Sequence, residues 1–232
     1  MNSESVEDYL KTIYLIQDEQ NDLPVSTSSL ASRLGVTNAS VTGMLKHLSS
    51  TEPKLVNYER YYGVTLSPSG YKSALEIVRH HRLIESFLFH KLGYSWDEVH
   101  SEAERLEHVI SDEMEDHLVI ALGNPISDPH GDPIPDIDGK INKPDLQSLA
   151  IMSLGQLVVI RRILGQEPEL LRYLSELGLV ISAHVQIESN APFNGPICIR
   201  LVGSSETILA LSREIAEKIL VLPLNDSLGK TL

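Results

Sequence analysis

The sequence predicts a mainly α-helical N-terminal part, with a winged helix-turn-helix and a second helical domain, followed by a small C-terminal β-barrel. Three observations support this fold class. Amphipathic helical patterns occupy most of the chain up to residue 122, and two short β-type runs interrupt them near residue 60. After residue 146 the pattern changes to short apolar β-type runs, and a proline-rich stretch separates the two parts.

The composition is that of a folded protein of one or two domains. A chain of 232 residues with 42% hydrophobic residues can bury a sizeable core. The one cysteine, Cys198, excludes an internal disulfide framework and favours a reducing compartment. Because the chain shows no signal-peptide pattern and no apolar run of transmembrane length, we expect a cytoplasmic protein that does not contact membranes.

The charge is unevenly distributed along the chain. A net charge of −13 argues against a surface that binds nucleic acid everywhere. Residues 24–72, however, hold five Lys or Arg against two Glu, which makes this part a locally basic module.

The basic module has the pattern of a helix-turn-helix. A first amphipathic helix over residues 6–16 is followed by two short helices, over 26–35 and 37–48, with Gly35 in the tight turn between them. The last of these helices carries small polar side chains that suit close entry into a major groove, and its Lys46 suits a phosphate.

A wing and a long helix follow. Residues 55–66 predict two short strands around a turn, and Lys54 and Arg60 are placed to contact the DNA backbone. A long helix is predicted from Pro68 to about Leu92, with a cap from the preceding serine. It carries a His and a Glu four residues apart, which therefore point the same way.

The next segment predicts an acidic helix from Val99 through Asp116. His100, Glu104, Glu107, His108 and Ser111 fall on one face of this helix. Nine acidic residues and one Arg lie between positions 97 and 116, and carboxylates so crowded repel one another. A bound divalent cation would offset this charge, whereas the simpler alternative is a solvated acidic face.

The same segment carries an apolar stripe that is typical of a dimer surface. An equally good interpretation is that this stripe is buried in the core of the protein. It consists of Leu106, Ile110, Met114 and Leu118. Helix-turn-helix proteins commonly bind palindromic DNA as two-fold dimers, which favours the first interpretation.

The rest of the chain predicts a linker and a β-rich domain. Residues 123–144 hold five of the twelve prolines, which excludes a regular helix or a central strand. Runs over 154–163, 180–187 and 197–202 are β-like, and helices are expected over 168–177 and 205–219. A five-strand barrel of about 75 residues closes such short strands without exposed edges. The expected domains are 1–70, 71–123, a linker over 124–145, and 146–232.

Taken together and in order, these motifs resemble the family of the diphtheria toxin repressor and the manganese transport regulator. The resemblance covers residues 6–135 and rests on the winged helix, His-x-x-x-Glu, Val-His-x-Glu-Ala-x-x-x-Glu-His and Pro-His-Gly-Asp-Pro-Ile-Pro. The C-terminal part resembles the SH3-like barrel, similar to a ferrous-transport accessory domain, of the longer members. The resemblance implies a homodimeric repressor of manganese or iron uptake genes that binds palindromic DNA when metal is bound.

The resemblance also implies site residues. The regulatory metal site would consist of Asp8, Glu104, Glu107 and His108. The second metal site would consist of His81, Glu85 and His100, with an acid near Glu167 or Glu169. In some manganese-type relatives the residues matching Asp128 and His130 also approach metal. DNA bases would be contacted by Thr37, Ala39, Ser40, Thr42 and Gly43, and phosphates by Lys46 and Arg60.

Departures from the family pattern bear on which metal is bound. Asp8 and Glu104 stand where iron-type members have Met and Cys. Because hard oxygen ligands suit Mn(II) better than sulfur ligands do, we expect Mn(II), with Fe(II) as the alternative. Short manganese-type members have Glu where this chain has Lys11, so their two-metal cluster does not transfer directly.

Two other functions compete with this one. A metalloenzyme is disfavoured for two reasons. A di-iron bundle needs Glu-x-x-His on two helices, but the residue three positions before His108 is Arg105 and not Glu. The sequence also contains no His-Glu-x-x-His zinc motif. We therefore expect no enzyme. The other alternative is a winged-helix regulator that is not gated by metal.

For the favoured function, a metal-dependent repressor, the expected mechanism is a population shift: a cation binds one conformation of the protein better than another and shifts the population toward it.

Overall fold

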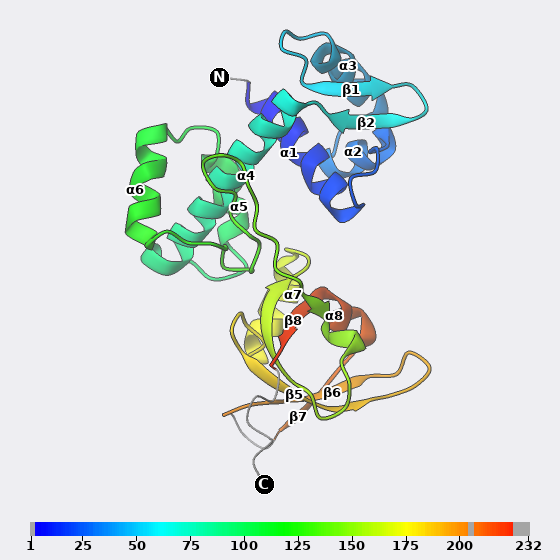
Figure 1. Cartoon of the computed structure of the whole chain (residues 1–232), viewed down its shortest axis with the longest axis vertical. Coiled ribbons are helices and arrows are strands. Elements are labelled where there is room, and N and C mark those ends of the chain that lie inside the picture. The colour runs from blue at the N-terminus through cyan, green and yellow to red at the C-terminus, as the bar shows by residue number, and fades with distance from the viewer. Residues whose placement is uncertain (1–2, 204–206, 225–232) are drawn as a thin grey trace. The chain divides into compact units, whose positions relative to one another are not determined.

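The structure is a computed structural model that describes residues 3–203 and 207–224 (Figure 1). The chain divides into two compact units, each made of three segments. The first unit comprises Met1–Leu83, Glu104–His117 and Ile134–Ile141, and the second comprises Ile84–Ala103, Leu118–Pro133 and Asn142–Leu232. Among the described residues, no helix is both long and apolar enough to cross a membrane.

The first unit begins with the predicted helix-turn-helix, which is confirmed. Ser26 accepts a hydrogen bond from the Ser29 amide, and Gly35 ends the helix with a φ of 65°, a conformation that glycine adopts without strain. Thr37 caps the next helix through the Ser40 amide. The three helices are α1 (Glu4–Glu19), α2 (Thr27–Leu34) and α3 (Asn38–Ser49).

The predicted wing is also confirmed as a hairpin. Its antiparallel strands are β1 (Val56–Glu59) and β2 (Gly63–Leu66). The strand β2 is held to the loop before α2, because Val64 and Val25 exchange two backbone hydrogen bonds of 2.8 and 2.9 Å. A Cβ at Gly63 would lie 2.6 Å from the Val25 carbonyl oxygen, so this close approach needs glycine.

One hydrophobic core joins these elements. The side chains of Leu10, Ile13, Leu45 and Leu48 are fully buried in it, together with Leu75 from the following helix. Burying each such side chain contributes about 1.5–3 kcal/mol. Because α1 packs against both α2 and β2, its position is coupled to that of the DNA-reading elements.

The helices that follow differ from the prediction at one point. The predicted long helix is present as α4 (Pro68–Phe87), which continues in a π-helix, Leu88–Leu92. The single helix predicted from 99 to 116 is wrong, because α5 (Val99–Leu106) ends and α6 (Asp112–Leu122) begins anew. The side chain and carbonyl of Ser111 accept hydrogen bonds from the amides of the first turn of α6, so a new helix starts there.

The second unit contains a six-stranded antiparallel sheet in the order β3-β8-β4-β5-β6-β7. Its strands are β3 (Gln147–Ser148), β4 (Leu157–Ile163), β5 (His184–Asn190), β6 (Ile197–Leu201), β7 (Ile208–Leu211) and β8 (Ile219–Pro223). Among the described strands, β3 and β7 do not pair with each other. The sheet is therefore open, and the predicted five-strand barrel is not confirmed.

The C-terminal helix is shorter than predicted. Residues 205 and 206 of the predicted helix over 205–219 lie outside the described residues. The prediction is wrong for the described part, because Ile208–Leu211 pairs with β6 as a strand and the helix there is limited to α8 (Arg213–Lys218). The Ser212 side chain caps α8 by accepting from the Ile215 amide. The other helix, predicted over 168–177, is confirmed as α7 (Pro168–Glu176).

The proline-rich stretch is not simply an exposed connection. Residues 128–135 are buried, and the Asp128 side chain accepts hydrogen bonds from the amides of His130 and Asp132, at 2.8 and 2.9 Å. A Cβ at Gly131 would lie 2.0 Å from the Arg161 carbonyl oxygen, so the turn is packed directly on β4. This packing fixes the histidine in the turn.

Candidate metal centres and nucleic-acid interface

The first unit contains a cluster of three potential metal ligands, Asp8, Glu107 and His108, termed the N-terminal cluster. One ligand atom from each lies within 4.8 Å of the others. The Nε2 atom of His108 is 3.0 Å from Asp8 Oδ1 and 3.5 Å from Glu107 Oε1. Asp8 comes from α1, while the other two lie in the turn after α5, so the cluster joins segments about a hundred residues apart.

The predicted regulatory site is thus assembled in three of its four members. The fourth predicted member, Glu104, is not part of this group of three. It forms an ion pair with Lys11, whose Nζ lies 2.7 Å from Glu104 Oε1 and 2.5 Å from Glu107 Oε1. Burial works to lower the pKa of Lys11, but the two carboxylates outweigh it and hold the pKa above its usual value. The ammonium therefore stays charged.

The environment of Asp8 would favour a bound cation. Burial raises the pKa of the Asp8 carboxyl above its usual value, even though His108 and Lys11 work in the opposite direction. A divalent cation among these side chains would relieve the cost of burying the carboxylates. Two carboxylates and an imidazole also form a ligand set that suits Mn(II) or Fe(II).

Sequence reasoning did not identify Glu7 as part of this site. Its Oε2 lies 2.7 Å from Nδ1 of His108, and both side chains are mostly buried. The contact with Glu7 orients the ring so that Nε2 points toward Asp8 and Glu107, where this nitrogen could bind a cation. The only signal in the sequence was the position of Glu7 directly beside a predicted ligand.

The second unit contains another cluster, Glu85, Asp128 and His130, termed the buried cluster. All three residues are buried, and one ligand atom from each lies within 4.8 Å of the others. The Trp96 indole stacks on the His130 ring, with the ring centroids 5.6 Å apart and an angle of 16° between the planes. The cluster thus lies in a tightly packed interior.

The tautomer of His130 can be deduced from its contacts. Its Nε2 lies 3.0 Å from the Trp96 carbonyl oxygen, and because a carbonyl can only accept, Nε2 must carry the proton. The other nitrogen, Nδ1, lies 3.9 Å from Glu85 Oε2 and has no hydrogen-bond partner among the described residues. A neutral imidazole nitrogen and a carboxylate oxygen that face each other in a buried site can both bind a cation between them.

The structure places the other predicted metal ligands as follows. In the first unit, Nδ1 of His81 is 2.5 Å from Glu107 Oε2, at the edge of the N-terminal cluster. In the second unit, Nδ1 of His100 is 3.2 Å from Glu85 Oε1, beside the buried cluster. Glu167 precedes α7 and is bonded to Lys218 at 3.0 Å, and its role as a ligand stays a prediction.

A buried network that the sequence did not indicate supports Glu107. Glu115 on α6 lies 2.6 Å from Arg79 Nε and 2.9 Å from His80 Nε2. The Nδ1 atom of His80 is 3.2 Å from the Glu107 carbonyl oxygen. The hydrogen bond from His80, together with Arg79, holds the pKa of Glu115 below its usual value.

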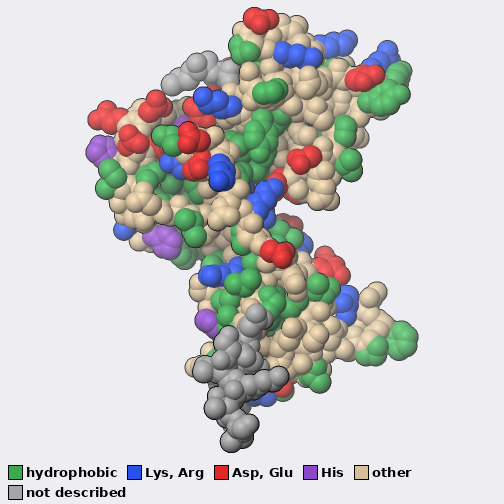
Figure 2. Space-filling view, viewed as in Figure 1, with side chains coloured by type: hydrophobic (Ala, Val, Ile, Leu, Met, Phe, Trp, Pro, Cys, Tyr) green, Lys and Arg blue, Asp and Glu red, His purple; other side chains and the backbone are tan. Residues whose placement is uncertain are grey.

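The predicted DNA-contacting residues lie on the exposed side of α3. Thr37, Ala39, Ser40, Gly43 and Lys46 are exposed, whereas Thr42 is half-buried and donates to the Asn38 carbonyl at 2.9 Å. The opposite side of α3 is fully buried. In the view of Figure 2, Lys and Arg side chains lie over the surface formed by α3 and the wing.

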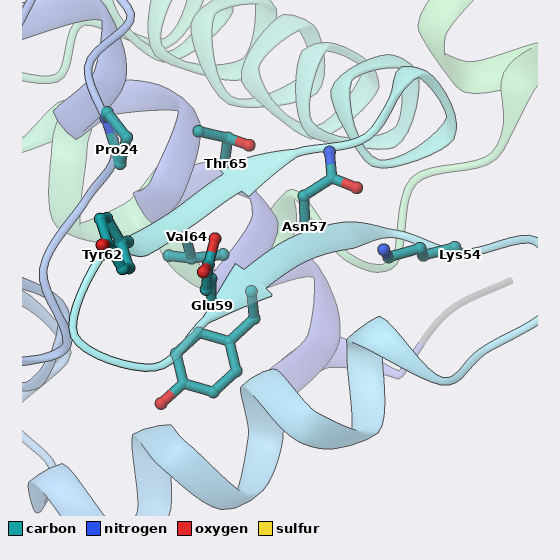
Figure 3. A pocket seen from close by; sticks show the side chains of 9 residues that line it. Pro24, Lys54, Asn57, Glu59, Tyr62, Val64 and Thr65 are labelled. Carbon is teal, nitrogen blue, oxygen red and sulfur yellow. The ribbon is translucent and has the colours of Figure 1, made fainter.

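The wing carries two exposed aromatic side chains that sequence reasoning did not single out. Tyr61, 89% exposed, has a φ of 72°, and the Arg60 guanidinium lies 4.9 Å from its ring centroid. Tyr62 lines a hollow of about 440 Å³ on the wing, between the turn and Lys54 (Figure 3). The wing thus presents cationic and aromatic groups together, which suits contact with a nucleic acid.

Comparisons with known families agree with this arrangement. Residues 1–64 match the N-terminal DNA-binding domain of iron-dependent repressors, and residues 67–136 match the metal-binding and dimerisation domain of the same family. Residues 147–223 match the FeoA domain.

Individual relatives cover most of the chain. It is 30% identical to the diphtheria toxin repressor of Corynebacterium glutamicum over 217 residues, which is 89% of this chain and 92% of the relative. It is 41% identical to an uncharacterized helix-turn-helix-type transcriptional regulator of Methanocaldococcus jannaschii over 120 residues, 52% of this chain and 94% of that one. A solved manganese-dependent transcriptional repressor in complex with manganese shares 36% identity with a TM-score of 0.83, covering 94% of this chain and all of that one.

Proposed function

Because the chain belongs to the family of iron- and manganese-dependent transcriptional repressors, we propose that it binds operator DNA when a divalent cation occupies the N-terminal cluster. Its first matched domain is a DNA-binding domain and its second is a metal-binding and dimerisation domain. Repression of manganese or iron uptake genes by a homodimer is the function that these features support best.

The observation that carries this proposal is the composition of the N-terminal cluster. Asp8 lies on α1, which packs against α2 and β2, while Glu107 and His108 come from a segment far along the chain. Holding all three side chains at one point fixes α1, and with it α2 and β2, relative to residues 104–117. A cation that binds this arrangement more tightly than a looser one shifts the population toward it.

Each side chain has a defined part in this arrangement. Asp8 and Glu107 provide oxygen ligands, and His108 provides Nε2 while Glu7 holds its ring in place. A bound Mn(II) or Fe(II) supplies two positive charges that offset the carboxylates of Asp8 and the fully buried Glu107. We propose Mn(II) as the favoured ion, because this cluster has oxygen and nitrogen donors without sulfur, and a manganese-bound repressor is among the similar structures.

We propose the buried cluster as a second cation site. The unpartnered Nδ1 of His130, the two buried carboxylates and the hydrogen bonds that fix Asp128 support it among the described residues. His100 lies beside this cluster through Glu85, and we propose that it assists there. Participation of His81 and Glu167 in metal binding stays a prediction of the family resemblance.

We propose that α3 and the wing bind the DNA. Bases would be read by Thr37, Ala39, Ser40, Thr42 and Gly43, while Lys46 and Arg60 would contact phosphates. The exposure of this face of α3 and the local excess of basic residues support the assignment.

Further parts of the proposal rest on the family alone. We propose an SH3-like arrangement for the FeoA-type domain, domain boundaries near residues 70, 123 and 145, and a cytoplasmic location. We also propose that the protein acts as a regulator without catalytic activity, since its family is one of transcriptional repressors.

Binding to DNA with and without metal tests the proposed function. An operator is first selected from random duplexes with Mn(II) present, and binding is then measured with Mn(II) and with a chelator. We expect tight binding only with Mn(II), and a strong loss in His108→Ala but not in the control His184→Ala, which alters an exposed histidine on β5. Equal binding of metal-free and metal-loaded protein would favour a regulator that is not gated by metal.

A further inference from the structure

The tip of the wing carries an arginine and a tyrosine in an unusual arrangement. The Arg60 guanidinium lies 4.9 Å from the centroid of the Tyr61 ring, in the geometry of a cation–π contact. Tyr61 has a φ of 72°, a left-handed backbone conformation that glycine or asparagine adopts much more easily than a bulky residue does. A strained backbone at an exposed turn indicates that the side chain there has a function.

The two aromatic side chains of this tip are almost fully exposed. Tyr61 is 89% exposed and Tyr62 is 75% exposed. Tyrosine is enriched at binding interfaces, because its rigid ring provides a large contact area there. Both rings lie in the segment that matches the DNA-binding domain of iron-dependent repressors. The surface that covers them is therefore expected to be that of DNA.

The tip is held at a fixed place in the first unit. Two backbone hydrogen bonds between Val64 and Val25 join β2 to the loop before α2. At the end of β2, the Leu66 amide donates a hydrogen bond of 3.1 Å to the Gln17 side chain of α1. Because the base of the hairpin is fastened in this way, the fold sets the position of its tip relative to α3.

The chemistry of this tip fits a narrow minor groove better than an isolated phosphate. A phosphate contact needs only a cation, and the exposed Lys46 on α3 can supply one. A narrow minor groove in A·T-rich DNA has an enhanced negative potential that attracts arginine, and its walls are formed by deoxyribose. A guanidinium is flat and weakly hydrated, and stacking on a ring leaves its edge free to donate hydrogen bonds.

We propose that Arg60 inserts into the minor groove beside the site read by α3, and that Tyr61 is a positioning residue that holds the guanidinium in the inserting conformation. The wing then selects A·T-rich flanks through the width and potential of the groove, at base pairs that α3 does not contact. This inference rests on the proposed DNA binding. It refines the phosphate contact proposed for Arg60, since a guanidinium in a narrow minor groove lies between the phosphates of both strands.

Exchange of the flanking base pairs tests the proposal. The Mn(II)-loaded full chain is titrated with duplexes that share one selected operator core and differ in their flanks, which are A·T, G·C or inosine·cytosine pairs. Inosine lacks the minor-groove amino group of guanine but keeps its major-groove edge, so it isolates the minor groove. The wild type should bind A·T and inosine flanks about ten-fold more tightly than G·C flanks. Equal affinity for all the duplexes would overturn the proposal.

Variants of the wing separate the parts of the two residues. Arg60→Ala should abolish the preference between flanks. Tyr61→Ala should reduce it about three-fold, the size of an exposed cation–π contact, whereas Tyr61→Phe keeps a ring beside the guanidinium and should retain it. The control Lys46→Ala should weaken binding to every duplex and leave the ratio of affinities unchanged.

Two results with these variants would contradict the proposal. One is an undiminished preference for A·T flanks in Arg60→Ala or in Tyr61→Ala. The other is a Tyr61→Ala protein that melts at a lower temperature and binds every duplex more weakly by the same factor, because a tyrosine with only a structural role would behave in this way.

The outcome is distinguishable from a failure of the proposed function. If the Mn(II)-loaded wild type binds the operator core with the same affinity in all flanks, only the inference about the wing fails. If the wild type binds no DNA in the presence of Mn(II), both fail.

Discussion

At the scale of single residues, the two candidate metal clusters contain side chains that orient the proposed histidine ligands. Glu7 fixes the ring of His108 from one side, and the Trp96 carbonyl fixes the ring of His130 in the other cluster. In both cases the contact of one ring nitrogen orients the other nitrogen toward the carboxylates of the cluster. The sequence indicates a histidine as a ligand, but only the fold shows which nitrogen is available.

Glu7 therefore offers a residue-scale prediction. Glu7→Gln keeps the length of the side chain but removes its charge, so it should weaken Mn(II) binding at the N-terminal cluster by about ten-fold, the usual effect of removing a carboxylate that supports a metal-bound histidine. Isothermal titration with Mn(II) measures this change. Glu4→Gln alters an exposed acid on the same helix and serves as the control. Equal weakening in both variants would show that general charge, and not ring orientation, is responsible.

At the scale of secondary-structure elements, the contact between α4 and α6 is made by Glu115. Its carboxylate binds Arg79 and His80, and these bonds hold its pKa below the usual value. A group whose pKa is lowered in the folded state contributes stability above its unfolded pKa, and this contribution disappears as the pH falls through the folded pKa.

The predicted consequence is a stability difference that depends on pH. Glu115→Gln should lower the free energy of unfolding by about 1–3 kcal/mol at neutral pH, as expected when a partly buried, charged hydrogen bond is removed. The difference between variant and wild type should shrink as the pH is lowered below the usual Glu range, because the wild-type carboxylate is then protonated too. Denaturant unfolding curves between neutral and acidic pH measure it. A difference that stays constant across this range would rule out the ionised Glu115 as the source.

A second element-scale prediction concerns α3. Lys46→Ala should weaken binding to all DNA sequences and reduce the salt slope by about one unit for each phosphate that a subunit no longer neutralises. Mn(II) affinity in the absence of DNA should stay at the wild-type value, because Lys46 is exposed on α3 and belongs to neither metal cluster. Binding curves over a range of salt concentrations measure the slope, and an unchanged slope would remove Lys46 from the interface.

At the scale of the whole molecule, the order of motifs in the sequence was sufficient to predict the helix-turn-helix and the wing, and three of the proposed ligands, Asp8, Glu107 and His108, lie together in the fold. Periodicity could not reveal that the acidic helix breaks after Leu106, since both halves share the helical pattern. Four apolar residues before α8 form a strand because β6 is available to pair with them, which is a long-range contact. The partner of Glu104 could not be predicted either, because Lys11 meets it only in the folded chain.

The central claim is that a cation in the N-terminal cluster and DNA on α3 and the wing favour the same conformation. Thermodynamic linkage then requires each ligand to tighten the binding of the other by the same factor. The most direct measurement is the Mn(II) affinity of the wild-type protein with and without saturating operator DNA. We predict at least about ten-fold tighter Mn(II) binding with DNA present, a coupling of about 1.4 kcal/mol, which His108→Ala should abolish. Identical Mn(II) affinities in the presence and absence of DNA would contradict the account.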